Sequence, residues 1–191
     1  MGHDPAILRP LVGNWLLFFG LILAELGLVF YLSARAERLA AGTAAMLFMG
    51  YAALNGVTLS VVLLAYTGQS VTNTFVVTAG MFGAMALYGS TTKRSLAGVG
   101  QFLFMGLIGI VLASLVGLFW HNNALQFVIA AVGVIVFTGL SAWDAQRLKQ
   151  MALATPEGHA GSVAVVGALA LYLDFINLFL SLLRLFGTRR E

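Results

Sequence analysis

Long apolar segments alternate with short polar connectors along this chain. Residues 39–92 contain no Asp, Glu, Lys or Arg, and neither do residues 95–143. Because a helix crosses the hydrocarbon core of a bilayer with about 20 apolar residues, each of these segments is long enough for two crossings. Together with one apolar segment before them and one after, the pattern predicts six transmembrane helices. Their predicted ranges are about 12–33, 43–66, 74–88, 98–120, 125–150 and 162–186.

The composition supports a membrane protein. Hydrophobic residues make up 60% of the chain and charged residues only 9%, whereas soluble domains average about 25% charged residues. We therefore expect one all-α domain over residues 1–191, a polytopic helical membrane bundle in contact with the lipid bilayer. The chain has no cysteine, which excludes disulfide and thiol chemistry. Its basic residues flank apolar segments, so nucleic acid is not an expected partner.

The basic residues are distributed unevenly among the connectors. The turns near Gly68 and Asn122 carry none, and three other connectors carry Arg35, Arg38, Lys93, Arg94, Arg147 and Lys149. The positive-inside rule places those three connectors in the cytoplasm. Arg184, Arg189 and Arg190 obey this rule only if the last segment re-enters the membrane instead of crossing it. The sequence leaves both arrangements open.

The last apolar segment, residues 161–186, carries an acid near its middle. A charge at the centre of a membrane helix costs about 2.5–3.5 kcal/mol on insertion scales, so Asp174 needs a partner or water. At helical spacing Asp174, Asn177, Ser181 and Arg184 form one polar stripe. We expect this helix to be central in the bundle, with the stripe facing protein or a wet cavity.

A second acid, Asp144, lies near the end of the preceding predicted helix. Consecutive membrane helices are antiparallel, so the carboxyl groups of Asp144 and Asp174 can be neighbours. Two neighbouring carboxyl groups cannot both ionise cheaply at low dielectric, and sharing one proton would make them a pH sensor. An alternative for Asp144 is a surface pair with Arg147, three residues further along the helix.

The first two predicted helices also carry polar residues. Glu25 is either a functional acid that faces the bundle or a protonated acid bonded to a neighbouring helix. Tyr51, Asn55 and Thr58 share one face of the second helix. For these three, hydrogen bonding between helices is favoured over a role in transport.

Small residues at helical spacing predict close approaches between helices. They are Gly80, Gly83 and Ala84 in the third predicted helix and Gly109, Ala113 and Gly117 in the fourth. His121 has no second His or Cys at ligand spacing, so we interpret it as an interfacial loop residue, not a metal ligand.

Two segments resemble a known family. GLSAWDAQRLK, residues 139–149, followed by ALALYLDFINLFLSLLRLFG, residues 168–187, resembles the Bax inhibitor-type (TMBIM) family, particularly its bacterial inner-membrane branch. ILAELGLVFYLSAR and VTAGMFGAMALYG resemble further stretches, so that the resemblance runs from Trp15 to Arg190. It implies a seven-helix bundle with a central last helix and a pH-responsive latch of two aspartates on a calcium leak. By this resemblance the latch falls on Asp144 and Asp174.

The resemblance also implies roles for other residues. Glu25 matches the acid of the family's second helix, and a family arginine falls on or near Arg35. With the polar faces described above, we predict pore or gate residues at Glu25, Arg35, Asn55, Asn177 and Ser181. Calcium is then the permeant ion, held weakly by Asp144 and Asp174. No resident cofactor is expected.

This chain departs from the family pattern in two respects. Trp143 and Ala145 stand where the family commonly has Tyr and Thr, which changes the hydrogen bonding around Asp144. The family's first helix has no counterpart before Val12, so we expect six helices instead of seven.

The predicted function is a pH-sensitive calcium leak in the bacterial inner membrane. An alternative is a regulatory membrane protein that binds a membrane protease or a partner in cell death or stress. A third class, the intramembrane aspartyl proteases, also uses two aspartates on adjacent helices. Asp174 follows Leu-Tyr-Leu and lacks the GxGD setting of those enzymes, so we do not expect an enzyme.

Overall fold

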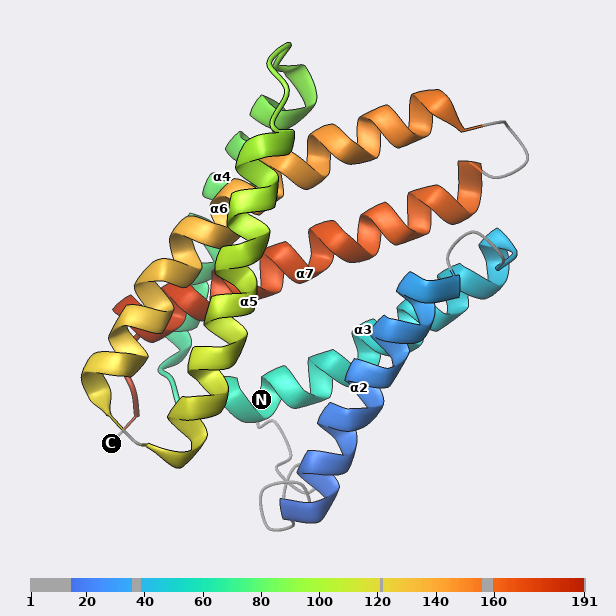
Figure 1. Cartoon of the computed structure of the whole chain (residues 1–191). Coiled ribbons are helices and arrows are strands. Elements are labelled where there is room, and N and C mark those ends of the chain that lie inside the picture. The colour runs from blue at the N-terminus through green and yellow to red at the C-terminus, as the bar shows by residue number, and fades with distance from the viewer. Residues whose placement is uncertain (1–14, 36–38, 121, 156–159, 191) are drawn as a thin grey trace.

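The computed structural model describes residues 15–35, 39–120, 122–155 and 160–190. Within these residues it is all-helical, which confirms the predicted fold class, and five of the helices, α3 to α7, are long and apolar enough to cross a membrane. The six helices are α2 (Trp15–Arg35), α3 (Ala41–Leu63), α4 (Gly68–Thr91), α5 (Ala97–Phe119), α6 (Asn123–Ala154) and α7 (Ala160–Phe186) (Figure 1).

Helices α3 to α7 all begin before their predicted starts, and at α4 and α6 a polar side chain caps the first turn. α4 begins at Gly68, and not near residue 74, since the Thr67 side chain accepts a hydrogen bond from the Ser70 N–H. α6 begins at Asn123, where the Asn122 side chain accepts a hydrogen bond of 2.8 Å from the Ala124 N–H. Such caps satisfy the free N–H groups of a first turn. The predicted start of the first helix, residue 12, lies outside the described residues.

Helix α7 is the centre of the bundle. It packs against α6, α4 and α3. α6 shares this central position, because it also packs against α4 and α5, whereas α2 packs on α3. Figure 1 shows the α2–α3 hairpin on one side of α7 and the α4–α5 hairpin on the other. The predicted central position of the last helix is therefore observed.

The buried core repeats this arrangement. Leu178 and Leu182 pack with Phe137 and other residues of α5 and α6. Leu169 joins a cluster with residues of α2 and α3, and Leu183 joins another around Tyr66. All three clusters use α7, so the hydrophobic contacts that hold the two hairpins together meet on this helix.

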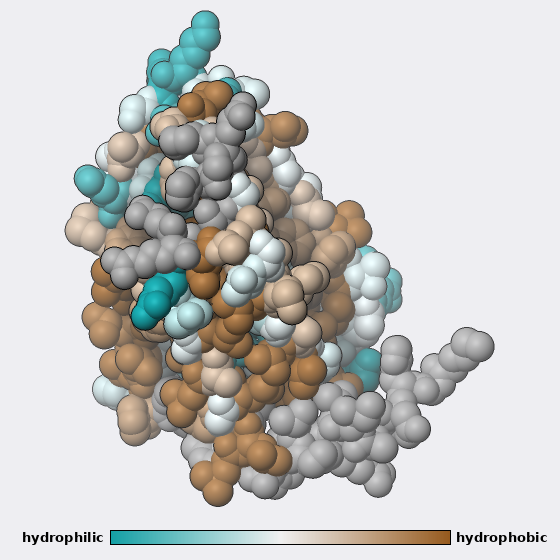
Figure 2. Space-filling model, turned by 90° about the vertical axis from the view of Figure 1, so that its right-hand side faces the viewer, coloured by the Kyte–Doolittle hydropathy of each residue, from teal (hydrophilic) through white to brown (hydrophobic). Residues whose placement is uncertain are grey.

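Much of the outer surface is apolar. Phe102 of α5 is 70% exposed and Phe30 of α2 is 73% exposed. Figure 2 shows broad hydrophobic areas on one face, with most of the strongly hydrophilic residues in its upper part. In water such a surface would be costly, but lipid chains solvate it as readily as protein does.

Glycine allows close helix packing, but at only one of the predicted glycines. A Cβ at Gly80, Gly83 or Gly109 would meet nothing within 4 Å, whereas a Cβ at Gly117 would lie 2.9 Å from Gln126 Nε2 of α6. A Cβ at Gly89 would instead lie 1.9 Å from the Ala142 carbonyl oxygen, where α4 crosses α6. Spacing identifies a smooth face of a helix, but only the tertiary arrangement decides whether another helix covers it.

The C-terminal tail lies at the end of the bundle that carries the α3–α4 turn. The Thr67 N–H donates to the Thr188 carbonyl at 3.0 Å, and the Arg190 N–H donates to the Ala65 carbonyl at 2.9 Å. α7 is an unbroken helix that is long and apolar enough to cross a membrane, which favours a crossing segment over a re-entrant one. Arg189 and Arg190 lie at the end opposite Lys93 and Arg94, against the positive-inside rule.

Gly89→Ala tests the α4–α6 crossing. The added methyl group would overlap the Ala142 backbone, so the helices must move apart. We expect a loss of about 1–3 kcal/mol of stability, as for other overpacked cores. Thermal unfolding of the purified protein in detergent measures the loss. Gly80→Ala is the matched control and should unfold at or slightly above the wild-type temperature, because alanine favours helix. Equal unfolding temperatures for the two variants would contradict the crossing.

Candidate functional site

One face of α7 lies directly against α6 over most of its length. A Cβ at Gly167 would lie 2.0 Å from Leu148 Cδ1, and a Cβ at Gly133 would lie 2.6 Å from Ser181 Oγ. Gly167, Asp174 and Ser181 follow one another at seven-residue intervals on α7, which places them on one face of the helix. This heptad spacing is a signal that our sequence interpretation missed.

The two aspartates meet in the middle of this contact. The carboxyl groups of Asp144 and Asp174 are neighbours across the α6–α7 contact and act on one another electrostatically. Asp174 is 5% exposed, and its Oδ2 atom is buried without a hydrogen-bond partner in the described chain. Ionised carboxylates only accept hydrogen bonds, so two carboxyl groups bond only when one of them carries a proton.

Arg147 is a secondary neighbour of this pair. Its guanidinium carbon lies 5.5 Å from the centre of the Trp143 ring, in a cation–π contact on its own helix. Asp174 and Arg147 both act on the Asp144 carboxyl group, and Asp174 is the stronger influence of the two. The aspartate pair therefore describes the surroundings of Asp144 better than a surface pair with Arg147.

Two hollows flank the aspartate pair along α7. One, of about 60 Å³, is lined by Asp144 and by Gly167 and its neighbours. The other, of about 390 Å³, lies among α5, α6 and α7, and its polar lining residues are Ser114, Asn177, Ser181 and Arg184. Three of the four residues of the polar stripe thus face a hollow, and Asp174 lies along α7 between the residues that line the two hollows.

A second buried polar cluster joins α2, α3 and α7. Glu25 of α2 is 8% exposed and accepts hydrogen bonds from Asn55 Nδ2, at 3.1 Å, and from Thr58 Oγ1. The Tyr172 hydroxyl of α7 donates to Asn55 Oδ1 at 3.0 Å. Glu25 is bonded to a neighbouring helix, and Asn55 and Thr58 supply hydrogen bonds between helices. Tyr172 was not among the predicted site residues.

The structure keeps the two polar clusters apart. Tyr172 and Asp174 are two residues apart on α7, which turns their side chains about 200° from each other. Glu25 therefore lies on the side of α7 opposite the aspartate pair. Arg35 belongs to neither cluster, because it is exposed at the end of α2 with its guanidinium over the Tyr31 ring at 5.8 Å.

Asn177 and Ser181 stay close to α7 and α6. Asn177 Nδ2 donates to the Leu173 carbonyl of its own helix at 2.8 Å, and Ser181 is buried against Gly133. Both still line the larger hollow.

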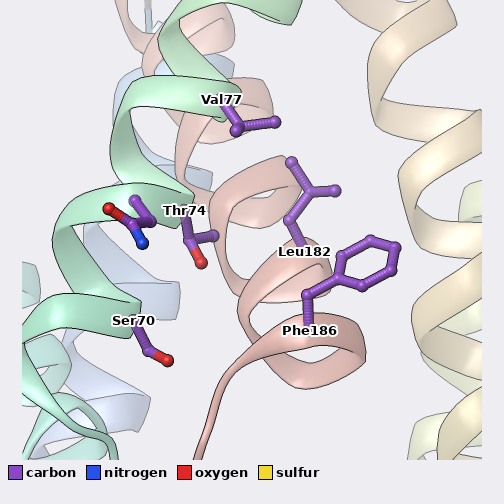
Figure 3. Close-up of a pocket in the computed structure, with 6 residues that line it drawn as sticks. Ser70, Thr74, Val77, Leu182 and Phe186 are labelled. Carbon is purple, nitrogen blue, oxygen red and sulfur yellow. The ribbon is translucent and has the colours of Figure 1, made fainter.

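A further hollow, of about 190 Å³, lies between α4 and α7. Figure 3 shows Ser70, Thr74 and Val77 of α4 turned towards Leu182 and Phe186 of α7. None of its lining residues is ionisable. We interpret it as a packing seam between the two helices and not as a site.

The described residues include no group of three or more His, Cys, Asp or Glu that could hold a metal ion. Calcium usually takes six to eight oxygen ligands. Asp144 and Asp174 could supply only part of such a shell, so a weak, transient role for them toward calcium stays a prediction.

These features define a class: a polytopic α-helical membrane protein with an acidic last helix at the centre of its bundle. Comparison with known families gives a match over residues 5–191 to the family described as inhibitor of apoptosis-promoting Bax1. The inner membrane protein YbhL of Escherichia coli K12 is 53% identical over 191 residues, covering 98% of this chain and 82% of YbhL. An uncharacterized membrane protein of Streptococcus pyogenes is 43% identical over 181 residues, covering 95% of this chain and 79% of that protein.

The chain therefore belongs to the Bax inhibitor-1 family, which confirms the resemblance seen in its sequence. Its apolar helices and its similarity to YbhL identify it as an integral protein of the inner membrane.

Tyr172→Phe and Asn55→Leu test whether the Glu25 cluster links the α2–α3 hairpin to α7. Both changes remove one partner of the same hydrogen bond, so their effects on unfolding should not add. We expect a coupling energy of about 0.6–2 kcal/mol, the range for hydrogen bonds between membrane helices. Unfolding in detergent of the single and double variants measures it. Ser60→Ala is the control, because its hydroxyl bonds only within α3, to Gly56. Additive losses would show that the bond contributes nothing.

Proposed function

We propose that this protein is a calcium leak of the inner membrane, controlled by a proton that Asp144 and Asp174 share. The observation that supports the proposal is that the carboxyl groups of Asp144 and Asp174 are neighbours, and act on one another, at the contact between α6 and α7. The pair holds the two helices together while it shares one proton, and its separation opens a path along α7.

The hollows on either side of the pair support this proposal. The smaller hollow reaches Asp144, and the larger hollow follows the polar stripe from Asn177 to Arg184. Because α7 carries Asp174 between them, moving α7 away from α6 at this point would join the two hollows. An ion would then pass carboxyl, amide and hydroxyl oxygens in succession.

The chemistry of these oxygens suits calcium. Calcium prefers hard oxygen ligands, and a leak needs sites weak enough for the ion to leave again. Two carboxyl groups that are partly satisfied by one another make such a weak site. The latch also agrees with the role that the family resemblance implies for the aspartate pair.

The pH dependence of flux tests the latch. Raising the pH removes the shared proton and leaves two repelling carboxylates, and lowering it adds a second proton and removes the charged partner. Both changes weaken the α6–α7 bond, so calcium flux should have its minimum at an intermediate pH. Asp144→Asn and Asp174→Asn each remove one titrating group and should shift or flatten this profile. Calcium uptake by liposomes that contain only the purified protein, measured over a pH series, gives the answer.

Glu157→Gln serves as the control, since this acid belongs to a polar connector of the sequence, outside the described residues. Its profile should match that of the wild type. Aspartate variants that keep the wild-type profile would overturn the latch. Absence of flux from the wild-type protein would overturn the leak and favour the alternative, a regulatory protein that acts through a membrane protease or another partner.

A reversible cross-link tests whether α6 and α7 must separate. The chain has no cysteine, and a Cβ at Gly167 would lie 2.8 Å from Leu148 Cγ. Leu148→Cys with Gly167→Cys should therefore bring the two Cβ atoms close to the 3.5–4.5 Å separation of disulfides. We expect oxidation of this double variant to hold flux near its minimum at every pH, and reduction to restore the pH response.

Leu148→Cys alone, treated with the same oxidant, should behave as it does when reduced. The cross-linked fraction is measured by cleaving the protein with a protease between α6 and α7 and then running electrophoresis without reducing agent. Only cross-linked protein keeps its two fragments together. Wild-type flux through fully cross-linked protein would show that the path does not open between α6 and α7.

A further inference from the structure

Arginines at the end of the bundle opposite Lys93 and Arg94 call for an explanation. The positive-inside rule accounts for the basic residues of the α4–α5 connector, but it predicts the opposite of what is found for Arg184 and Arg189. Neither residue belongs to the aspartate pair or to the Glu25 cluster. A positive charge at the margin of a membrane is favourable where an anion meets it.

These two arginines line one hollow. Its volume is about 650 Å³, and it lies between the end of α3, the start of α6 and the end of α7. We call it the distal hollow. Asn123 and Gln126 of α6 line it beside the arginines, and Val62 and Phe127 provide apolar walls. No Asp or Glu is among these lining residues, so the hollow has two positive charges and no described negative one.

The tail holds Arg189 in place at this hollow. Arg189 pairs with Tyr66 in an antiparallel bridge, and its guanidinium lies over the Tyr66 ring at 6.0 Å. Gly187 permits this path, because a Cβ there would lie 2.3 Å from the Leu183 carbonyl oxygen and 2.8 Å from the Tyr66 ring. A side chain that is already ordered loses less entropy when it binds a ligand.

The other arginine comes from the last turn of α7. Arg184 lines both the distal hollow and the larger hollow of the polar stripe. Its planar guanidinium offers paired N–H donors that match the oxygens of a phosphate. The first turn of α6 adds the amide groups of Asn123 and Gln126 and the positive end of a helix dipole.

We propose that the distal hollow binds a phosphate group through Arg184 and Arg189. The two guanidinium groups neutralise the phosphate, and the amide side chains of α6 donate further hydrogen bonds to it. Val62 and Phe127 can accommodate an apolar chain attached to the phosphate, as in an anionic phospholipid. The ligand bridges α6, α7 and the tail, so binding stabilises the folded bundle. This proposal does not depend on calcium flux.

Ligand-dependent thermal unfolding of the full chain in an uncharged detergent tests the site. The probes are dihexanoyl phosphatidylglycerol and inorganic phosphate, with sodium chloride at equal ionic strength as the reference. A ligand that binds only the folded protein raises its unfolding temperature in a saturable way. Tighter binding of the lipid than of inorganic phosphate identifies a headgroup site, and the reverse order identifies a site for the free anion.

Arg184→Gln and Arg189→Gln should each weaken binding by about tenfold or more, the contribution of one charge-assisted hydrogen bond. Arg190→Gln is the matched control, because Arg190 belongs to the same tail but does not line the distal hollow, and it should bind as the wild type does. If Arg189→Gln loosens the tail, Arg184→Gln, which leaves the tail intact, decides the question. No saturable shift with either probe, or equal shifts in wild type and Arg184→Gln, would overturn the proposal.

Discussion

A carboxyl group buried in a membrane helix is stable only where another polar group meets it, and for Asp174 that group is the carboxyl of Asp144. This requirement determines how α7 can be placed. α7 must turn the face of Asp174 towards α6, at the one level where α6 carries an acid. Two glycines permit close contact of α6 and α7 about two turns to either side of Asp174. Gly167 of α7 meets Leu148, and Gly133 of α6 meets Ser181, and a larger side chain at either glycine would force the helices apart.

Placing Asp174 against α6 also determines what the other side of α7 does. Tyr172 is turned away from α6 and reaches Asn55, which in turn bonds to Glu25. α7 thus carries the buried Asp174 on one side and is linked through Asn55 to the buried Glu25 on the opposite side. A rotation or shift of α7 that separates the two aspartates would also disturb the Glu25 cluster, because Tyr172 and Asp174 belong to the same helix.

The two ends of α7 also have different surroundings. At its start the helix borders a small hollow next to Asp144, and at its end Arg184 lies between two larger hollows. An unbroken α7 connects these ends rigidly. A phosphate held at Arg184 would therefore be linked mechanically to the aspartate pair, because both act on one helix that packs against α6 along its length.

The apolar pattern of the chain was enough to predict the six helices of the described residues and the polar stripe of the last one, because both follow from local periodicity and from the cost of charge in lipid. The resemblance of two segments was enough to indicate the family. Three features could be found only in the folded chain: Glu25 and Asp174 lie on opposite sides of α7, Gly89 and not Gly80 meets another helix, and Arg189 lies at the end away from Lys93. Each of these features depends on which helix lies against which. The periodicity of a helix shows which side of it is polar or smooth, but it does not show which other helix packs against that side.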